Sequence, residues 1–190
     1  MSTPLLHLLA GPNGAGKTTF VDRILIPATH LPFINADRIA ASLWPGEEEA
    51  HAYQASQIAA RERADSMREL RSFITETVFS HPSKADLVQQ AVDYGYLVTL
   101  HVLLVPEDVA VGRVSYRVNH GGHTVPETKI RERYHRLCAL IAESRHCATR
   151  AVFYDNSVAM PAFRTVAVFD HGALVGKADW PSWTPEEIRT

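Results

Sequence analysis

The chain has 190 residues, of which 46% are hydrophobic and 21% charged, a composition typical of a globular domain and not of a disordered chain. Its 19 Lys and Arg residues nearly balance its 21 Asp and Glu residues, and the net charge of −2 argues against a general nucleic-acid binder. No apolar run is long enough to span a membrane, and the first one continues directly into a glycine loop, so it indicates a strand and not a signal peptide. Cys138 and Cys147 have no metal-binding spacing and are expected to be free thiols in a cytoplasmic protein.

Hydrophobic periodicity and turn residues predict alternating strands and helices. In chain order we expect a strand at 5–10, a helix at 16–25, a strand at 31–37, helices at 38–45 and 47–73, a strand at 73–80, a helix at 82–95, a strand at 96–105, helices at 107–122 and 126–147, and a strand at 150–157. Pro27 is expected to stop the first helix, and Asp37 to close the second strand. Residues 163–179 predict a hairpin that turns at Asp170, His171 and Gly172, and the tail from Trp180 is expected to be loosely held.

This alternation predicts an α/β fold in three layers, with a mainly parallel five-stranded sheet at its centre and a C-terminal β-hairpin. We expect residues 1–190 to form a single domain, with a helical lid at about 106–136 and the hairpin and tail at about 163–190. Because parallel strands joined by right-handed crossovers end at one edge of the sheet, that edge should carry the functional site.

The stretch GPNGAGKT, from Gly11 to Thr18, fits the phosphate-loop pattern G-x-x-x-x-G-K-[ST] at every position. Its glycines allow successive N–H groups to face a phosphate, the lysine can reach the terminal phosphates, and the threonine hydroxyl can bind Mg²⁺. The alternative is a glycine-rich turn with a chance lysine, but here the loop follows an apolar strand and begins a helix. Residues expected to contact ATP are Gly11, Pro12, Asn13, Gly14, Ala15, Gly16, Lys17, Thr18 and Thr19.

Two carboxylates belong to predicted strands that should end near this loop: Asp37 closes the second strand, and Glu76 lies within the third. Asp37 is the candidate base that accepts a proton from an attacking hydroxyl, although it could instead cap the next helix. Glu76 lies in an apolar strand, where a charge is costly unless it is paired or functional. It is expected to hold Mg²⁺ or to bind the acceptor, and an exposed glutamate at a strand end is the alternative.

Basic residues gather after the fourth predicted strand, in two helices separated by a glycine break. Arg113, Arg117 and Arg133 are the candidates for a lid that neutralises charge on the transferred phosphoryl group, whereas Arg136 is expected to be solvated. Most arginines of this segment could equally form a solvated helix face.

Two further polar features lie near these elements. His120 and His123 have a metal-like spacing but lack a third ligand, so a hinge or substrate contact is favoured, with His123 as the candidate. Asn156, at the end of the fifth strand, could contact adenine or simply form a turn.

The chain resembles the zeta-toxin family of P-loop kinases, in the branch described as predicted ABC-type ATPases. The resemblance rests on AGPNGAGKTTF, FINADRIA, FITETVFS, GYLVTLHVLLV, the arginine segment with GGHTVPE and RERY, and FYDNS, in this order from about residue 5 to 157. It implies a small-molecule kinase in which Lys17 and Thr18 handle ATP and Mg²⁺ and Asp37 is the base. The same resemblance implies that Glu76 holds the acceptor and that the lid contains Arg113, Arg117 and Arg133.

Several members of that family phosphorylate UDP-N-acetylglucosamine, and many are toxins held by an antitoxin. The resemblance therefore implies an ATP- and Mg²⁺-dependent kinase of a nucleotide sugar, acting as a toxin, with an antitoxin as partner. Two alternatives remain open: a kinase of another acceptor, such as a nucleoside, a nucleotide or an RNA end, and a nucleotide-binding regulatory module without catalysis.

Overall fold

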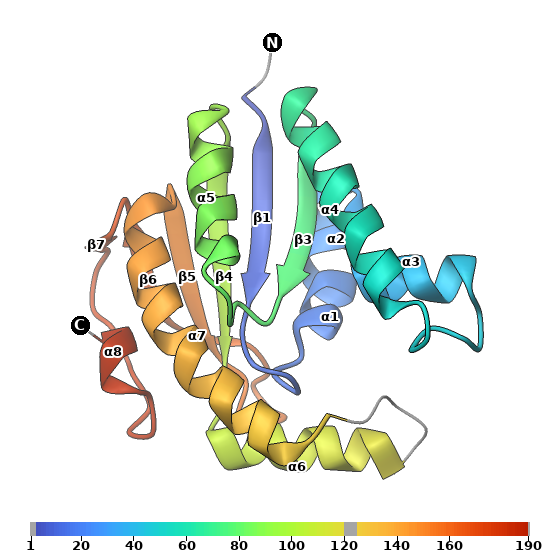
Figure 1. Ribbon diagram of the computed structural model, residues 1–190. Helices are drawn as coiled ribbons and strands as arrows, with labels where there is room; N and C mark the ends of the chain where they lie inside the picture. The colour runs from blue at the N-terminus through green and yellow to red at the C-terminus, as the bar shows by residue number, and fades with distance from the viewer. Residues whose placement is uncertain (1–2, 120–124, 190) are drawn as a thin grey trace.

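A computed structural model describes residues 3–119 and 125–189 and shows a central sheet covered by helices on both faces (Figure 1). The strands are β1 (Leu5–Ala10), β2 (Phe33–Ile34), β3 (Phe73–Thr77), β4 (Leu97–Leu104), β5 (Arg150–Asp155), β6 (Arg164–Asp170) and β7 (Ala173–Leu174). The helices are α1 (Lys17–Phe20), a π-helical turn (Val21–Leu25), α2 (Ile26–Thr29), α3 (Ala36–Leu43), α4 (Ala52–Arg68), α5 (Ser83–Asp93), α6 (Glu107–Asn119), α7 (Glu127–Cys147) and α8 (Glu186–Arg189).

The sheet has the strand order β2-β3-β1-β4-β5-β6-β7. The first five strands in this order run parallel, whereas β6 pairs antiparallel with β5 and β7 pairs antiparallel with β6. In Figure 1 the arrowheads of β1 and β3 point to the same edge, next to the start of α1. The predicted parallel five-stranded core is therefore confirmed, and the predicted hairpin extends this same sheet.

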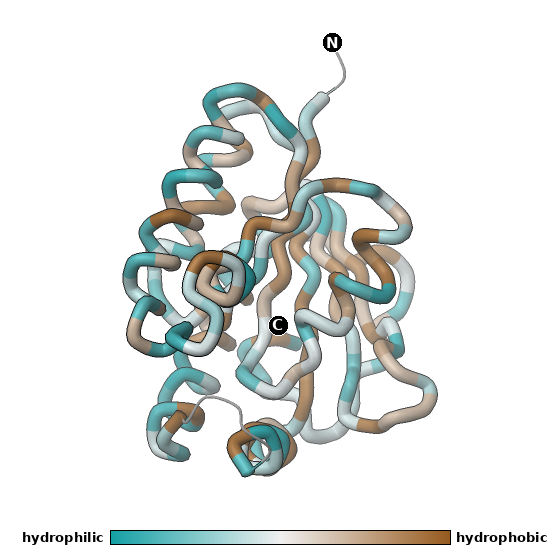
Figure 2. Tube along the Cα trace, turned by 90° about the vertical axis from the view of Figure 1, so that its right-hand side faces the viewer, coloured by the Kyte–Doolittle hydropathy of each residue, from teal (hydrophilic) through white to brown (hydrophobic). Residues whose placement is uncertain are grey.

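Apolar side chains fill both interlayer spaces. Leu6, Leu8 and Ala10 of β1 face a core shared with α4, α5, α7 and α8, whereas Leu9 faces the opposite core under α1 and α6. Burial on both faces explains why the parallel strands are continuous apolar runs in the sequence. Figure 2 shows the same arrangement, since brown segments concentrate in the central strands and teal segments lie on the outer helices. No helix among residues 3–119 and 125–189 is both long and apolar enough to cross a membrane.

The first helical run is longer than predicted. It passes through Pro27 and ends at Thr29, with His30 in the left-handed conformation. A proline disturbs a helix because it lacks an N–H group and clashes with the preceding turn. Here the π-helical turn Val21–Leu25 comes directly before α2, whose second residue is Pro27. This wider turn leaves room for the proline ring within the helical run.

The C-terminal tail is docked, so the prediction that it is loosely held is wrong. The Trp180 ring packs edge-on against Phe153, with ring centroids 5.3 Å apart. Ile188 is fully buried, and its carbonyl accepts a hydrogen bond of 2.9 Å from the buried guanidinium of Arg145. That guanidinium also lies over the Phe169 ring. The tail is therefore anchored by a few apolar residues, although most of its residues are polar.

Candidate active site

The phosphate loop is held in its curled form by close packing. Gly11, Gly14 and Gly16 all have positive φ angles, which side-chain-bearing residues rarely adopt. A Cβ atom on Gly11 would lie 2.4 Å from the Leu103 carbonyl oxygen at the end of β4. Helix α1 begins directly after the loop without a side-chain cap, so its first N–H groups are available to a phosphate.

Lys17 lies over its own loop. Its ammonium group donates hydrogen bonds to the carbonyl oxygens of Gly11 at 2.9 Å and Pro12 at 3.0 Å. Burial lowers the pKa of Lys17, while the charges of Glu76 and Asp37 act in the opposite direction. The lysine can exchange these carbonyls for phosphate oxygens without leaving the loop.

Glu76 is the centre of a polar cluster at the end of β3. The Thr18 hydroxyl donates to this carboxylate, 3.2 Å from each oxygen, and the Asn35 amide donates to Oε1 at 2.8 Å. Burial raises the pKa of Glu76, whereas Lys17 and the two hydrogen bonds lower it. The cluster offers the hydroxyl and carboxylate oxygens that Mg²⁺ prefers. No group of three or more His, Cys, Asp or Glu residues suited to a metal occurs in the described ranges.

Asp37 belongs to a helix and not to a strand. Strand β2 ends at Ile34, and Asp37 lies exposed in the first turn of α3. The N-cap of α3 is Asn35, whose side-chain oxygen accepts a hydrogen bond of 2.8 Å from the Arg38 N–H. The prediction that Asp37 closes the second strand and the alternative that it caps the helix are therefore both wrong, because the short β2 leaves room for a cap two residues earlier.

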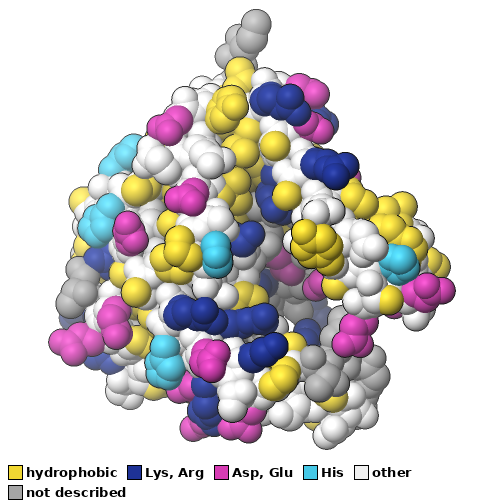
Figure 3. All heavy atoms as spheres, viewed as in Figure 1, with side chains coloured by type: hydrophobic (Ala, Val, Ile, Leu, Met, Phe, Trp, Pro, Cys, Tyr) yellow, Lys and Arg dark blue, Asp and Glu magenta, His cyan; other side chains and the backbone are white. Residues whose placement is uncertain are grey.

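One cleft of about 460 Å³ brings these groups together at the carboxyl edge of the sheet. Figure 3 shows a hollow between the side that carries α5 and the side that carries α3 and α4, with Lys and Arg side chains along it. The described residues that line the cleft are Asn13, Gly14, Gly16, Lys17, Thr18, Thr19, Asn35, Ala36, Asp37, Ser56, Ala59, Arg63, Glu76, Thr77, Val78, Lys84 and Arg117.

The candidate lid arginines have different surroundings. Arg117 of α6 lines the cleft. Arg113 lies one helical turn earlier and donates to the backbone carbonyls of Gly14 at 3.3 Å and Ser157 at 3.5 Å, so it contacts the phosphate loop from outside. Arg133, the seventh residue of α7, is not among the residues that line the cleft. Arg136 is exposed and donates to the carbonyl of Glu132 in its own helix.

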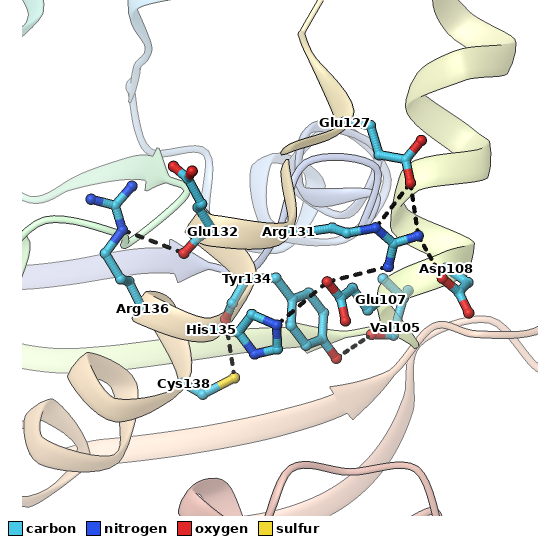
Figure 4. A network of polar contacts seen from close by, with 10 residues as sticks. All are labelled: Val105, Glu107, Asp108, Glu127, Arg131, Glu132, Tyr134, His135, Arg136 and Cys138. Carbon is cyan, nitrogen blue, oxygen red and sulfur yellow. Dashed lines mark hydrogen bonds and ion pairs between the residues drawn. The ribbon is translucent and has the colours of Figure 1, made fainter. Parts of the chain in front are cut away.

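Arg131 joins the two helices of the predicted lid (Figure 4). From α7 it forms ion pairs with Glu107 and Asp108 at the start of α6, and with Glu127 one turn earlier in its own helix. The Tyr134 hydroxyl donates a hydrogen bond of 2.8 Å to the backbone carbonyl of Val105, just before α6. These contacts lie at the base of the helix pair, so they support it without contacting the cleft.

Asn156 is buried behind the phosphate loop. Its amide donates to the Ala15 carbonyl at 2.9 Å, and its oxygen accepts a weak bond of 3.4 Å from the Phe163 N–H. We therefore propose that Asn156 supports the loop, in place of the predicted contact with adenine. His120 and His123 lie outside the described residues.

Several cleft residues were not predicted from the sequence. Asn35 precedes α3 in the typical position of an N-cap, and this position could have identified it. Ser56, Arg63 and Lys84 lie inside ordinary helical patterns, and nothing in the sequence distinguishes them from solvated positions.

The curled loop, its lysine and the parallel sheet define a P-loop domain with a kinase-like fold. A sequence profile of the AAA_33 family, described as an AAA domain, matches residues 6–140, and the chain belongs to this family. No curated protein sequence matches the chain significantly.

Solved structures share this fold at low sequence identity. A chain in the crystal structure of AvrRxo1-ORF1:AvrRxo1-ORF2 with sulphate ions matches 91% of this chain with a TM-score of 0.71 and 17% identity, and the same complex with ATP gives a TM-score of 0.70. The PezAT chromosomal toxin-antitoxin system of Streptococcus pneumoniae matches 82% of this chain and 68% of that chain, with a TM-score of 0.63 and 15% identity. Shikimate kinase from Acinetobacter baumannii, in complex with shikimate, matches 84% of this chain and 87% of its own, with a TM-score of 0.51 and 20% identity.

The chain spans 60% of the length of the AvrRxo1 complex chain that it matches. These similarities confirm the predicted P-loop kinase-like fold.

Proposed function

We propose that the protein transfers the γ-phosphoryl group of ATP to a hydroxyl group of a small acceptor. The observation that carries this proposal is the gathering of Lys17, Thr18, Asp37 and Glu76 in one cleft at the carboxyl edge of the sheet. A regulatory module would need only the phosphate loop. A second, exposed carboxylate in the same cleft favours catalysis, because transfer to a hydroxyl needs a group that accepts its proton.

The residues of the cleft then have separate roles. The loop N–H groups and Lys17 bind the phosphates, and Asp37 accepts the proton of the attacking hydroxyl. Thr18 and Glu76 would hold Mg²⁺, which neutralises charge on the phosphates when it is bound. Asn35 keeps Glu76 oriented through its 2.8 Å hydrogen bond. Of the three candidate lid arginines, Arg117 lines the cleft and would meet charge on the transferred group.

We further propose a nucleotide sugar such as UDP-N-acetylglucosamine as the acceptor and a toxin role with an antitoxin partner. The fold shared with a toxin-antitoxin system supports this proposal. Expression in a bacterium is then expected to slow growth, and Lys17→Ala and Asp37→Asn should each relieve the effect. Equal harm from all three proteins would contradict the toxin role.

An acceptor-dependent formation of ADP tests the enzymatic proposal. Purified protein is incubated with ATP and Mg²⁺, with or without a metabolite extract, and ADP is measured over time. We expect the extract to accelerate ADP formation by the wild-type protein and not by Lys17→Ala. The same rate of ADP formation with and without the extract would contradict transfer to an acceptor, and no ADP formation at all would support a nucleotide-binding module without catalysis.

A further inference from the structure

Two basic side chains line a part of the cleft that the phosphate loop does not form. Arg63 comes from α4, and Lys84 is the second residue of α5. Ser56, Ala59 and Arg63 follow the spacing i, i+3, i+7, so one face of α4 forms this wall of the cleft. The wall belongs to the same cleft as Asp37 and Glu76.

The fold places these two cations together, and the charge of the exposed neighbour Glu62 partly offsets the effect of burial on the pKa of Arg63. Within the described part of the chain, neither the Arg63 nor the Lys84 side chain makes a hydrogen bond or ion pair. Burial lowers the pKa of both groups, and the charge of Arg63 lowers the pKa of Lys84 further. Like charges that are partly removed from water are unfavourable unless an anion joins them.

Other arginines of the molecule contrast with this pair. Each of the following forms an ion pair with a carboxylate: Arg38, Arg68, Arg71, Arg131 and Arg164. Most of these partners lie on the surface, and Asp155 is buried at the end of β5. Arg63 and Lys84 differ from these five arginines because they form no ion pair within the described residues, at a place where a ligand has access.

We propose that Arg63 and Lys84 form an anion-binding subsite for a phosphate or carboxylate group of the phosphoryl acceptor. The inference rests on the proposed function and narrows it, because it makes the acceptor an anionic metabolite and not a neutral sugar or nucleoside. The acceptor hydroxyl would lie at Asp37 while its anionic group is held by α4 and α5. Arg suits this role because its planar donors match the oxygens of phosphate or carboxylate.

Inorganic phosphate can probe the subsite directly once the phosphate loop is filled. The protein is saturated with Mg²⁺ and a non-hydrolysable ATP analogue, and phosphate replaces chloride at constant ionic strength while thermal unfolding is followed. We expect saturable stabilisation of the wild-type protein, because a ligand of the folded state raises the unfolding temperature. Arg63→Gln and Lys84→Gln should each weaken phosphate binding at least about 10-fold, since each removes a charge-assisted contact.

The controls separate a specific subsite from general effects of salt. Arg61→Gln removes an exposed charge from the same helix and should bind phosphate like the wild-type protein. Arg63→Lys should retain part of the affinity, and stabilisation by the ATP analogue should persist in every variant and so confirm folding. Absence of saturable stabilisation in the wild-type protein, or equal phosphate binding by all variants, would overturn the proposal.

The chemistry of the reaction product provides an independent test. In a metabolite extract, the species that gains a phosphate should already carry a phosphate or carboxylate group. If the main product derives from a neutral sugar or nucleoside, the subsite proposal fails while the proposed function stands. Specific phosphate binding without any transfer would preserve the subsite and contradict the proposed function.

Discussion

At the scale of single residues, the two carboxylates of the cleft have different surroundings. Glu76 is held by Thr18 and Asn35, and burial raises its pKa. Asp37 is exposed in the first turn of α3 and is free to approach an acceptor. A fixed carboxylate suits a metal ion, whereas an accessible one suits proton transfer.

Replacing Asp37 with asparagine should separate binding from chemistry. We expect Asp37→Asn to leave ATP affinity nearly unchanged and to lower turnover about 10²-fold or more, because an amide cannot accept the proton. Turnover with acceptor and equilibrium binding of ATP are the two measurements. Asp86→Asn, an exposed change on α5, is the control, and unchanged turnover in Asp37→Asn would remove Asp37 from catalysis.

Replacing Glu76 with glutamine should alter the metal requirement. Since both Glu76 oxygens lie 3.2 Å from the Thr18 hydroxyl, we expect Glu76→Gln to raise the Mg²⁺ concentration needed for half-maximal activity about 10-fold. Activity is measured against Mg²⁺ at saturating ATP and acceptor. A normal Mg²⁺ dependence combined with a raised KM for the acceptor would assign Glu76 to acceptor binding instead.

At the scale of elements, the helix pair α6–α7 contains arginines with distinct roles. Arg131 fastens the two helices, Arg113 contacts the loop backbone, and Arg117 lines the cleft. If Arg117 meets charge that develops during transfer, Arg117→Ala should lower turnover far more than it weakens ATP binding. Arg136→Ala, in an exposed position, is the control, and equal turnover in both variants at saturating ATP would contradict the role of a lid arginine.

The docked tail is the second element with a measurable contribution. Ile188 is fully buried against the core, so Ile188→Ala should reduce the free energy of unfolding by about 2–4 kcal/mol. Chemical denaturation measures this loss, and Val175→Ala, at an exposed position, should change stability little. A similar stability of both variants would mean that the tail does not contribute to the folded core in solution.

At the scale of the whole molecule, the hydrophobic pattern of the sequence predicted the fold, and the glycine-rich motif predicted the phosphate loop. Continuous apolar runs identified the parallel strands, and the glycine pattern identified the residues around Lys17. The sequence could not show that Pro27 lies inside a helical run, because the π-helical turn that accommodates it is a three-dimensional adjustment. Nor could it show that Arg63 and Lys84 meet in the cleft, because the packing of α4 and α5 on the sheet brings them together.

Stability of the whole domain should depend on a buried histidine. His101 of β4 is linked to His7 at 3.0 Å and to the Tyr154 hydroxyl at 3.2 Å. Burial lowers the pKa of His101 from 6.5 to about 3. The unfolded chain therefore takes up a proton below about pH 6.5 that the folded state does not, and stability is lost as the pH falls from there toward 3.

This linkage predicts a loss of about 2 kcal/mol between pH 6.5 and pH 5 from His101 alone. Denaturation at a series of pH values measures it. His101→Gln should be less stable at neutral pH but show a shallower decline on acidification. An identical pH slope in both proteins would assign the acid sensitivity to other groups.

Labelled ATP can test most directly whether the protein transfers a phosphoryl group to another molecule. ATP with heavy oxygen in its γ-phosphate is incubated with the protein and a metabolite extract, and the mixture is analysed by mass spectrometry. We expect one class of metabolite to gain a labelled phosphate with the wild-type protein and none to do so with Lys17→Ala. Release of labelled inorganic phosphate alone, with no labelled metabolite, would contradict phosphoryl transfer to an acceptor.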